Sequence, residues 1–234
     1  MKSLIEFNNV SKEYKMGTHI IKAADSLNLD IGEGELVVIL GPSGSGKSTL
    51  LNLLGGLDRP TRGKIIIDGE NISEYSDKEL TRYRAKEIGF IFQFYNLIPN
   101  LTACENIELL NDVVDDDIDG SEILDKVGLS EHIDKFPSEL SGGEQQRVSI
   151  ARAIAKNPKM LLCDEPTGAL DSNTGKMIME LLVKLCEEEN TTVIIVTHNG
   201  EFAKIANKII HIKNGQIEGI EINENPQPID AIKW

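Results

Sequence analysis

A glycine-rich octapeptide constrains the fold of this chain more than any other feature. Its residues are Gly41-Pro42-Ser43-Gly44-Ser45-Gly46-Lys47-Ser48, which follow the apolar run 36–40 and precede the helix-forming run 49–54. A buried strand, a tight glycine turn and a helix in this order let backbone N–H groups point inward around a phosphate. Lys47 supplies a full charge to the outer phosphates, and Ser48 offers a hydroxyl to Mg²⁺. The pattern predicts a nucleoside triphosphate site made by these eight residues and Thr49.

Two further apolar runs have the character of buried parallel strands. Residues 160–163 and 193–196 are apolar, and each run is followed by a polar turn. Between them, residues 172–189 carry apolar side chains at helical spacing. Strands that alternate with helices in this way form a parallel sheet covered by helices, so the fold class is α/β.

Other regions depart from that alternation. Asp68-Gly69 and Asn214-Gly215 follow β-branched runs and predict tight hairpin turns between antiparallel strands. The middle of the chain reads as helices and loops punctuated by proline and glycine. We therefore expect one domain over residues 1–234: a P-loop NTPase core with a parallel sheet and an antiparallel β subdomain (1–92 and 158–234), and an inserted helical subdomain (93–157).

Composition narrows the class of partners. The 234-residue chain has a formal net charge of −14, which disfavours nucleic acid because phosphates are repelled. It has no run of the ~18 apolar residues that a membrane span needs, and no apolar signal segment precedes Glu6. Cys104, Cys163 and Cys186 are too scattered for a metal or disulfide pattern. These observations predict a soluble cytoplasmic protein that would reach a membrane only through a partner.

Four polar residues follow predicted core strands. Asp164 and Glu165 come directly after the run 160–163, at the ligand-binding edge of a parallel sheet. There Asp164 can hold Mg²⁺, and Glu165 can orient or deprotonate an attacking water molecule. Gln93 and His198 also follow apolar runs, although a lone Gln or His in such a place is usually a surface or capping residue.

One motif identifies the family that the chain resembles. Its residues are Leu140-Ser141-Gly142-Gly143-Glu144-Gln145-Gln146-Arg147. Ser141 and Glu144 form a capping box that opens a helix, and two glycines leave its N-terminus accessible to a second anion. The motif resembles the signature of ABC ATPases, and the other motifs follow in ABC order. The resemblance implies ATP and Mg²⁺ as cofactors and ATP hydrolysis as the activity.

In that family two subunits pair head to tail. The resemblance therefore implies a dimer in which Ser141, Gly142, Gly143 and Glu144 of one chain cover the γ-phosphate of the ATP that the other chain holds. Many members carry Gln where Glu144 stands, and Ser where Gly168 stands. Neither difference removes a phosphate contact or a metal ligand, so we expect activity to be retained.

The resemblance assigns four further residues. Gln93 resembles the residue that contacts Mg²⁺ and senses a membrane permease, and His198 resembles the switch histidine that contacts the γ-phosphate. Asp171 resembles the aspartate that links the two sites, or it simply caps the helix that begins at Ser172. Tyr14 matches the aromatic residue that stacks on adenine, whereas a lone Tyr near a strand more often packs in place.

A finer resemblance concerns the partner. Residues 51–61 and 168–175 are similar to the branch of lipoprotein-release and macrolide-export ATPases, whose partners are permeases with a large outer domain. This implies export or extraction of a peptide, lipoprotein or antibiotic, with the apolar segment 94–99 as the candidate permease contact. Two alternatives stay open: a complex that transmits a signal or force without moving cargo, and a soluble ABC ATPase without a permease.

Two segments carry weaker signals. Asp115, Asp117 and Asp119 match half of a calcium loop, but Lys126 at its twelfth position would repel the ion, so we expect no calcium. The proline-containing end, residues 225–234, predicts an extended tail without a regular helix.

Overall fold

A computed structural model describes residues 3–114 and 117–232, and it confirms the α/β fold class. One sheet has six strands, of which β3, β6, β7, β8 and β9 run parallel while β10 is antiparallel to β9. Its strands, in spatial order, are β10 (Gln216–Ile222), β9 (Lys208–Lys213), β3 (Leu36–Leu40), β8 (Thr192–Thr197), β7 (Met160–Asp164) and β6 (Ile88–Ile91).

The second sheet is antiparallel and has four strands. They are, in spatial order, β2 (His19–Gly32), β1 (Ser3–Met16), β4 (Arg62–Ile67) and β5 (Glu70–Asn71). The turn between β4 and β5 has φ values of 49° at Asp68 and 85° at Gly69, and the turn between β9 and β10 has 50° at Asn214 and 77° at Gly215. Two successive left-handed residues suit the twist of a two-residue hairpin, so both predicted turns are confirmed.

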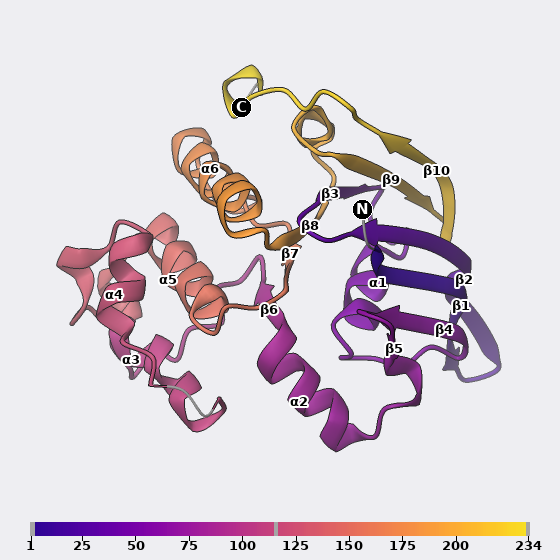
Figure 1. The fold of residues 1–234 in the computed structure, drawn as a ribbon, viewed down its shortest axis with the longest axis horizontal. Coiled ribbons are helices and arrows are strands. Elements are labelled where there is room, and N and C mark those ends of the chain that lie inside the picture. Colours follow the sequence, from indigo (N-terminus) through magenta and orange to yellow (C-terminus); the bar gives the residue numbers. More distant parts are fainter. Residues whose placement is uncertain (1–2, 115–116, 233–234) are drawn as a thin grey trace.

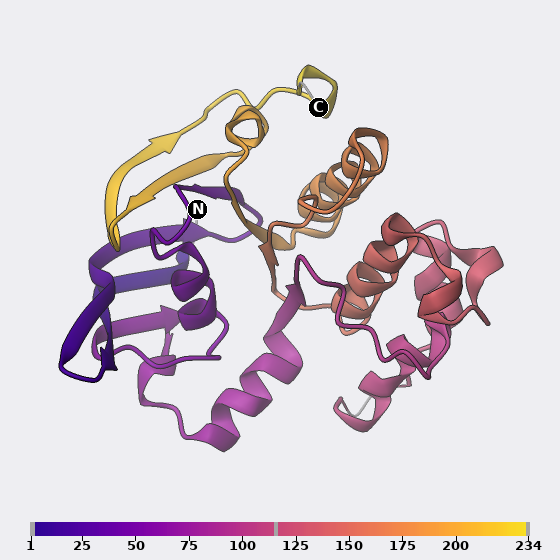
Figure 2. The ribbon, with the colours of Figure 1, turned by 180° about the vertical axis from the view of Figure 1, so that it is seen from behind.

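Six α-helices and several short 3₁₀ helices complete the described chain. The α-helices are α1 (Lys47–Leu54), α2 (Asp77–Glu87), α3 (Ala103–Glu108), α4 (Gly120–Lys126), α5 (Gly142–Ile154) and α6 (Ser172–Glu189). Figure 1 shows α3, α4 and α5 gathered on one side of the molecule, away from the antiparallel sheet, and Figure 2 shows the same separation from behind. The described residues between β6 and β7 form helices and loops, with no strand among them.

The central strands of the six-stranded sheet, β3, β7 and β8, are buried on both faces, as continuous apolar runs predict. On β3, Val37 and Ile39 pack with α1 and the antiparallel sheet, whereas Leu36 and Val38 face the cluster that includes α5 and α6. Alternate side chains of each central strand therefore belong to different cores. This packing fixes the carboxyl ends of β3, β7 and β8, where the polar residues of interest follow.

The end of the described chain folds back against α6. The Asp230 carboxylate pairs with Lys176, the Gln227 N–H donates to the carbonyl oxygen of Lys204, and Ile232 is buried. The expectation of an extended tail is wrong for these residues, because a 3₁₀ turn (Ile229–Ala231) docks on α6 through apolar and ionic contacts. Trp234 lies outside the described residues.

The acidic segment before α4 has a local structural role. Asp119 is the N-cap of α4, and its carboxylate accepts hydrogen bonds from the N–H groups of Ser121 and Glu122. Asp115 lies outside the described residues. No helix in the described ranges is both long enough and apolar enough to cross a membrane.

Candidate functional site

The glycine-rich loop connects β3 to α1 and curls over its own lysine. The Lys47 ammonium donates to the carbonyl oxygens of Gly41 and Pro42, at 2.8 and 3.1 Å. Gly46 is the N-cap of α1 and has a φ of 106°, which favours glycine. A Cβ on Gly46 would lie 2.3 Å from the carbonyl oxygen of Ala23, so a side chain cannot fit there without moving the backbone. The loop therefore needs glycine at this position for both conformation and space.

The N-terminus of α1 is prepared for an anion. Of the α-helices in the described part of the chain, α1 alone begins without a side-chain cap, and its first turn contains no acidic residue. The Ser45 hydroxyl is buried and has no hydrogen-bond partner among the described residues. Uncapped N–H groups at a helix start carry partial positive charge, and a buried polar group without a partner is costly. This donor set fits phosphate oxygens.

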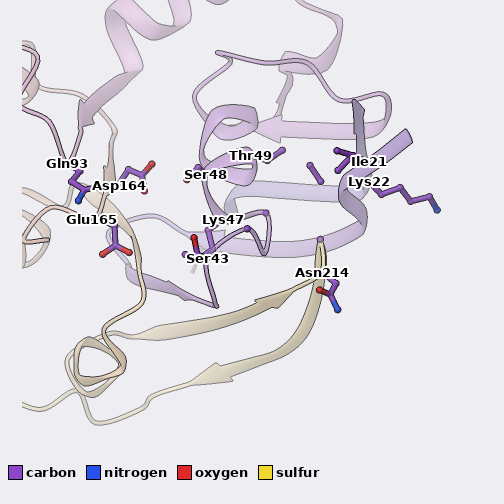
Figure 3. A pocket seen from close by; sticks show the side chains of 14 residues that line it. Ile21, Lys22, Ser43, Lys47, Ser48, Thr49, Gln93, Asp164, Glu165 and Asn214 are labelled. Carbon is purple, nitrogen blue, oxygen red and sulfur yellow. The ribbon is translucent and has the colours of Figure 1, made fainter. Parts of the chain in front are cut away.

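A cavity of about 620 Å³ lies against this loop (Figure 3). In Figure 3, Gln93, Asp164 and Glu165 lie close together at one end, and Ile21, Lys22 and Asn214 lie at the other. The predicted site residues that line the cavity are Ser43, Gly44, Gly46, Lys47, Ser48, Thr49, Gln93, Asp164 and Glu165. The fold thus brings together motifs that are far apart in the sequence.

Asp164 ends β7 beside the start of α1. Burial raises the pKa of the Asp164 carboxyl, and the charge of Glu165 adds to this, while a hydrogen bond from Ser48 and the charge of Lys47 act in the opposite direction. A carboxylate that burial has stripped of water is stabilised more strongly by a bound cation than one that water surrounds. The oxygen donors of Ser48, Gln93 and Asp164 are of the kind that Mg²⁺ prefers, so these residues fit the ion.

Glu165 is fixed by groups at the end of β8. Its φ of 49° is rare for a residue with a large side chain, and its N–H donates to the carbonyl oxygen of Val196 at 2.9 Å. The Thr197 hydroxyl donates to Oε2 at 2.9 Å, and the His198 N–H donates to Oε1 at 3.0 Å. The His198 Nδ1 lies 2.7 Å from Oε1, and because a carboxylate only accepts, Nδ1 must carry the proton. The two carboxylate oxygens therefore have defined positions at the cavity wall.

The signature residues lie outside this cavity, at the N-terminus of α5. The predicted capping box is confirmed: the Ser141 N–H donates to Glu144 Oε2 at 2.7 Å, and the Glu144 N–H donates to the Ser141 hydroxyl at 3.4 Å. The bonds from the Ser141 backbone and hydroxyl hold the pKa of Glu144 below its ordinary value. Gln146 is buried and donates to the carbonyl oxygen of Pro166 at 3.0 Å, which links α5 to the segment after Glu165.

Tyr14 and Asp171 also lie outside the cavity lining. The Tyr14 hydroxyl donates to Asp58 Oδ2 at 2.6 Å, and Tyr14 pairs across β1 and β2 with Ile21, which does line the cavity. Tyr14 is therefore next to the cavity wall. Asp171 accepts from the N–H groups of Asn173 and Thr174, at 3.0 and 3.1 Å, so the predicted cap of α6 is confirmed.

Sequence reasoning assigned no part in the site to five of the lining residues, which are Ile21, Lys22, Ala23, Asn214 and Gly215. The Gly215 N–H donates to the carbonyl oxygen of Ser45 at 2.8 Å, and the Asp25 N–H donates to the carbonyl oxygen of Gly215 at 2.8 Å. Asn214-Gly215 was predictable as a turn, but its place beside the phosphate loop depends on packing between strands that are remote in sequence. Thr197, which holds Glu165, precedes His198 and could have been considered from that position.

The fold and the cavity define a P-loop NTPase. The family profile described as "ABC transporter" matches residues 24–168, and the chain belongs to this family. The sequence resemblance to ABC ATPases is thereby confirmed.

The chain is similar to three members of this family over nearly its whole length. An uncharacterized ABC transporter ATP-binding protein of Methanocaldococcus jannaschii, MJ0796, is 49% identical over 92% of this chain and 95% of its own length. A solved structure described as a dimeric, post-hydrolysis state of the ATP-binding cassette MJ0796 bound to ADP and Pi has a TM-score of 0.87, with 47% identity over 93% of this chain and 98% of that one. The lipoprotein-releasing system ATP-binding protein LolD 2 of Chlorobaculum tepidum is 42% identical, with 92% of each chain covered. The macrolide export ATP-binding/permease protein MacB of Wolinella succinogenes is 44% identical over 92% of this chain and 34% of its own length.

Proposed function

We propose that this chain binds and hydrolyses ATP with Mg²⁺, and that it drives a separate membrane permease as one half of a head-to-tail dimer. The observation that carries the ATPase activity is the single cavity that joins the phosphate loop with Gln93, Asp164 and Glu165. The relative MJ0796, which is 49% identical to this chain, has a solved structure described as an ATP-binding cassette bound to ADP and Pi. This supports ATP as the ligand here.

The phosphate loop binds the triphosphate. Residues 41–49 surround the phosphates with backbone N–H groups, and Lys47 turns from the carbonyl oxygens of Gly41 and Pro42 toward the outer phosphates. Ser48, Gln93 and Asp164 are the residues that would hold Mg²⁺, which when bound neutralises charge on the phosphate oxygens. Tyr14, beside the cavity wall, provides the ring that stacks on adenine.

Glu165 acts as the general base. One of its carboxylate oxygens accepts a proton from the water molecule that attacks the γ-phosphate. The Thr197 hydroxyl and the His198 N–H hold the carboxylate, so its orientation does not depend on the His198 side chain. The His198 side chain is 75% exposed, so it can leave Glu165 and contact the γ-phosphate.

A second chain completes the site. The signature residues are not part of the lining of their own chain's cavity, so Ser141, Gly142 and Gly143 would serve a nucleotide held by another copy. The helical subdomain, residues 93–157, carries this motif as a unit, and Asp171 lies between the two sites. Two solved structures of MJ0796 are described as dimeric, which supports the same assembly here.

The proposed permease contact has two parts, the apolar segment 94–99 and a cleft beside α2. The cleft has a volume of about 790 Å³, and it is lined by α2 residues including Lys78, Arg82 and Lys86 and, across from them, by Val113. In the segment 94–99, Ile98 is 42% exposed and Phe94 is 76% exposed, more than any other large apolar side chain in the described ranges, which supports a contact surface there. The names of the LolD 2 and MacB relatives refer to lipoprotein release and macrolide export, which supports a permease that handles a lipoprotein or an antibiotic. The chain would then be peripheral on the inner face of the cell membrane.

The ATPase assignment is tested with Glu165→Gln. The substitution keeps the size of the side chain but removes the base, so ATP binding persists while hydrolysis falls by about 10²–10⁴-fold. We expect a stable ATP-bound dimer to accumulate, measured by phosphate release and by light scattering. Hydrolysis at the parent rate would show that another group is the base.

The permease assignment is tested by affinity purification of tagged Glu165→Gln protein from membranes of the native host, with ATP and Mg²⁺. Recovery of a permease with a large outer domain is the expected result. A variant with Phe94→Ser and Ile98→Ser serves as the control, because it should lose the permease while still binding ATP. Recovery of soluble partners alone would contradict the permease assignment.

A further inference from the structure

The hydroxyl of the signature serine already has an acceptor within its own chain. Ser141 Oγ donates to Glu144 Oε2 at 2.8 Å, and the Ser141 N–H donates to the same oxygen. A carboxylate only accepts and a hydroxyl has a single proton, so that proton points at Glu144. Ser141 cannot donate to a phosphate oxygen unless it first leaves Glu144.

The capping box of α2 provides an internal reference. There Ser76 Oγ and the Ser76 N–H donate to Glu79 Oε2 at 2.6 and 2.7 Å, and the Glu79 N–H reaches the Ser76 hydroxyl at 3.4 Å. The box at α5 has nearly the same geometry, so helix capping alone accounts for the bonds between Ser141 and Glu144.

What distinguishes Glu144 is a further polar contact, with a histidine ring. His132 ends the 3₁₀ helix Ser130–His132, and its Nε2 lies 3.2 Å from Glu144 Oε1. The His132 Nδ1 is buried and has no hydrogen-bond partner within the described ranges. Within the described ranges, Nε2 is therefore the ring nitrogen through which His132 makes its polar contact, and that contact is with Glu144.

The two oxygens of Glu144 are thus held separately, Oε2 by Ser141 and Oε1 by His132. We propose that Glu144, held by His132, is a positioning residue that competes with the phosphate of the partner chain's ATP for the Ser141 hydroxyl. The inference rests on the proposed function, since it requires the head-to-tail dimer. Closure exchanges one charge-assisted hydrogen bond for another, so Glu144 raises the ATP concentration at which the dimer forms.

A glutamine at this position would act differently. Its amide NH₂ can donate to the Ser141 oxygen, which leaves the hydroxyl proton for the phosphate. Glu144→Gln should therefore favour closure, and loss of the His132 contact should do the same more weakly by releasing Glu144. The two effects depend on each other, because His132 acts only through Glu144.

The experiment measures dimer formation against ATP concentration by light scattering, with every chain carrying Glu165→Gln. We expect Glu144→Gln to lower the half-dimerising ATP concentration about tenfold, the ratio typical of one hydrogen bond to a charged group. His132→Phe should lower it less, and the double variant should match Glu144→Gln alone. Glu79→Gln is the matched control, because it makes the same change in the capping box of α2, and it should leave the curve unchanged.

Two further measurements keep the result interpretable. Thermal unfolding verifies that each variant is folded, and His132→Gln, which keeps a donor nitrogen, should restore the parent curve. An unchanged or higher half-dimerising concentration in Glu144→Gln would overturn the inference. So would a higher value in His132→Phe, since His132 would then offset charge instead of holding Glu144. If the Glu165→Gln parent never dimerises with ATP, the proposed dimer fails, and this inference fails with it.

Discussion

The helices α1 and α5 both have glycine at the N-terminus, and they differ in what satisfies their first N–H groups. α1 begins after Gly46, in a left-handed conformation, with Lys47 as its first residue and no side-chain cap. α5 begins after Ser141, in an extended conformation, with the Glu144 carboxylate as an internal cap. The first N-terminus is open to an external anion, whereas the second already holds an anion from its own chain. ATP should therefore bind first at α1 and engage α5 of another copy only afterwards.

The two helices also differ in what holds them in place. Leu50, Leu53 and Leu54 of α1 are fully buried between the two sheets, so apolar packing fixes the phosphate loop. α5 also packs on the sheet, but polar bonds to backbone add to its position. Arg152 donates to the carbonyl oxygens of Asn96 and Tyr95, at 2.9 and 3.2 Å, and so ties α5 to the segment that follows Gln93. The phosphate loop, which packing fixes, is suited to bind ATP. The signature at α5, which hydrogen bonds tie to a loop, is suited to move with that loop.

The largest expected effect breaks the site at α1. Lys47→Ala removes the only full positive charge that the phosphate loop itself contributes, and we expect ATP affinity to fall roughly a hundredfold, the upper range for bonds to charged groups. Calorimetric titration with ATP and Mg²⁺ measures it. Lys64→Ala, at an exposed position on β4, is the control and should bind as the parent does. Unaltered affinity of Lys47→Ala would remove the phosphate loop from the account.

A smaller effect separates the conformation of the loop from its space. Gly44 and Gly46 both have positive φ, of 77° and 106°, but a Cβ on Gly44 would meet no atom within 4 Å. Gly44→Ala should cost about 1–2 kcal/mol for the left-handed backbone alone. Gly46→Ala adds the collision with Ala23, so we expect about 2–4 kcal/mol. Urea unfolding compares the two variants, and equal costs would contradict the close approach of the loop to β2.

The last expected effect is on the pH dependence of the free energy of unfolding. It concerns Lys156, which lies beyond the C-terminal end of α5. The Lys156 ammonium donates to the carbonyl oxygen of Arg84, at 2.6 Å, and burial lowers the pKa of Lys156 to about 8 from its ordinary value of 10.5. Above pH 8 the folded chain has lost a proton that the unfolded chain keeps until about pH 10.5, so this residue makes the free energy of unfolding rise with pH in that window. Lys156→Met should lose that rise.

Urea unfolding of the parent and Lys156→Met, below pH 8 and at about pH 10, measures the difference. The parent should gain stability relative to the variant at the higher pH. The same pH dependence in both proteins would mean that Lys156 keeps its ordinary pKa.

Much of the fold follows from local patterns in the sequence. The continuous apolar runs predict strands buried on both faces, the Asp68-Gly69 and Asn214-Gly215 dipeptides predict hairpins, and Ser141 with Glu144 predicts the start of α5. Each of these signals is carried by residues that are near one another in the sequence. The lining of the cavity by Ile21, Lys22 and Asn214 could not be predicted in the same way, because it arises where two sheets meet.

The signature illustrates a second limit. Its motif predicts a capping box and an anion site, but both use the same N–H groups, and local sequence does not say which prevails. The contact between His132 and Glu144 joins two segments through tertiary packing, and no spacing rule relates them. Likewise, the tail docks on α6 because Ile229 and Ile232 find apolar neighbours there, which proline spacing alone does not reveal.

The central claim is that α1 binds ATP within one chain while α5 serves the ATP of another. Ser141→Asp and Ser141→Asn, each in the Glu165→Gln background, test it, because Asp and Asn are both good N-caps and only Asp adds negative charge. Light scattering with ATP and Mg²⁺, paired with calorimetric measurement of ATP affinity at concentrations where the chains are monomeric, is the measurement. We expect both variants to bind ATP equally as monomers, and only Ser141→Asn to form dimers. Loss of ATP binding by monomeric Ser141→Asp would contradict the division of roles between the two helices. So would Ser141→Asp dimers that are as stable as those of the Glu165→Gln parent.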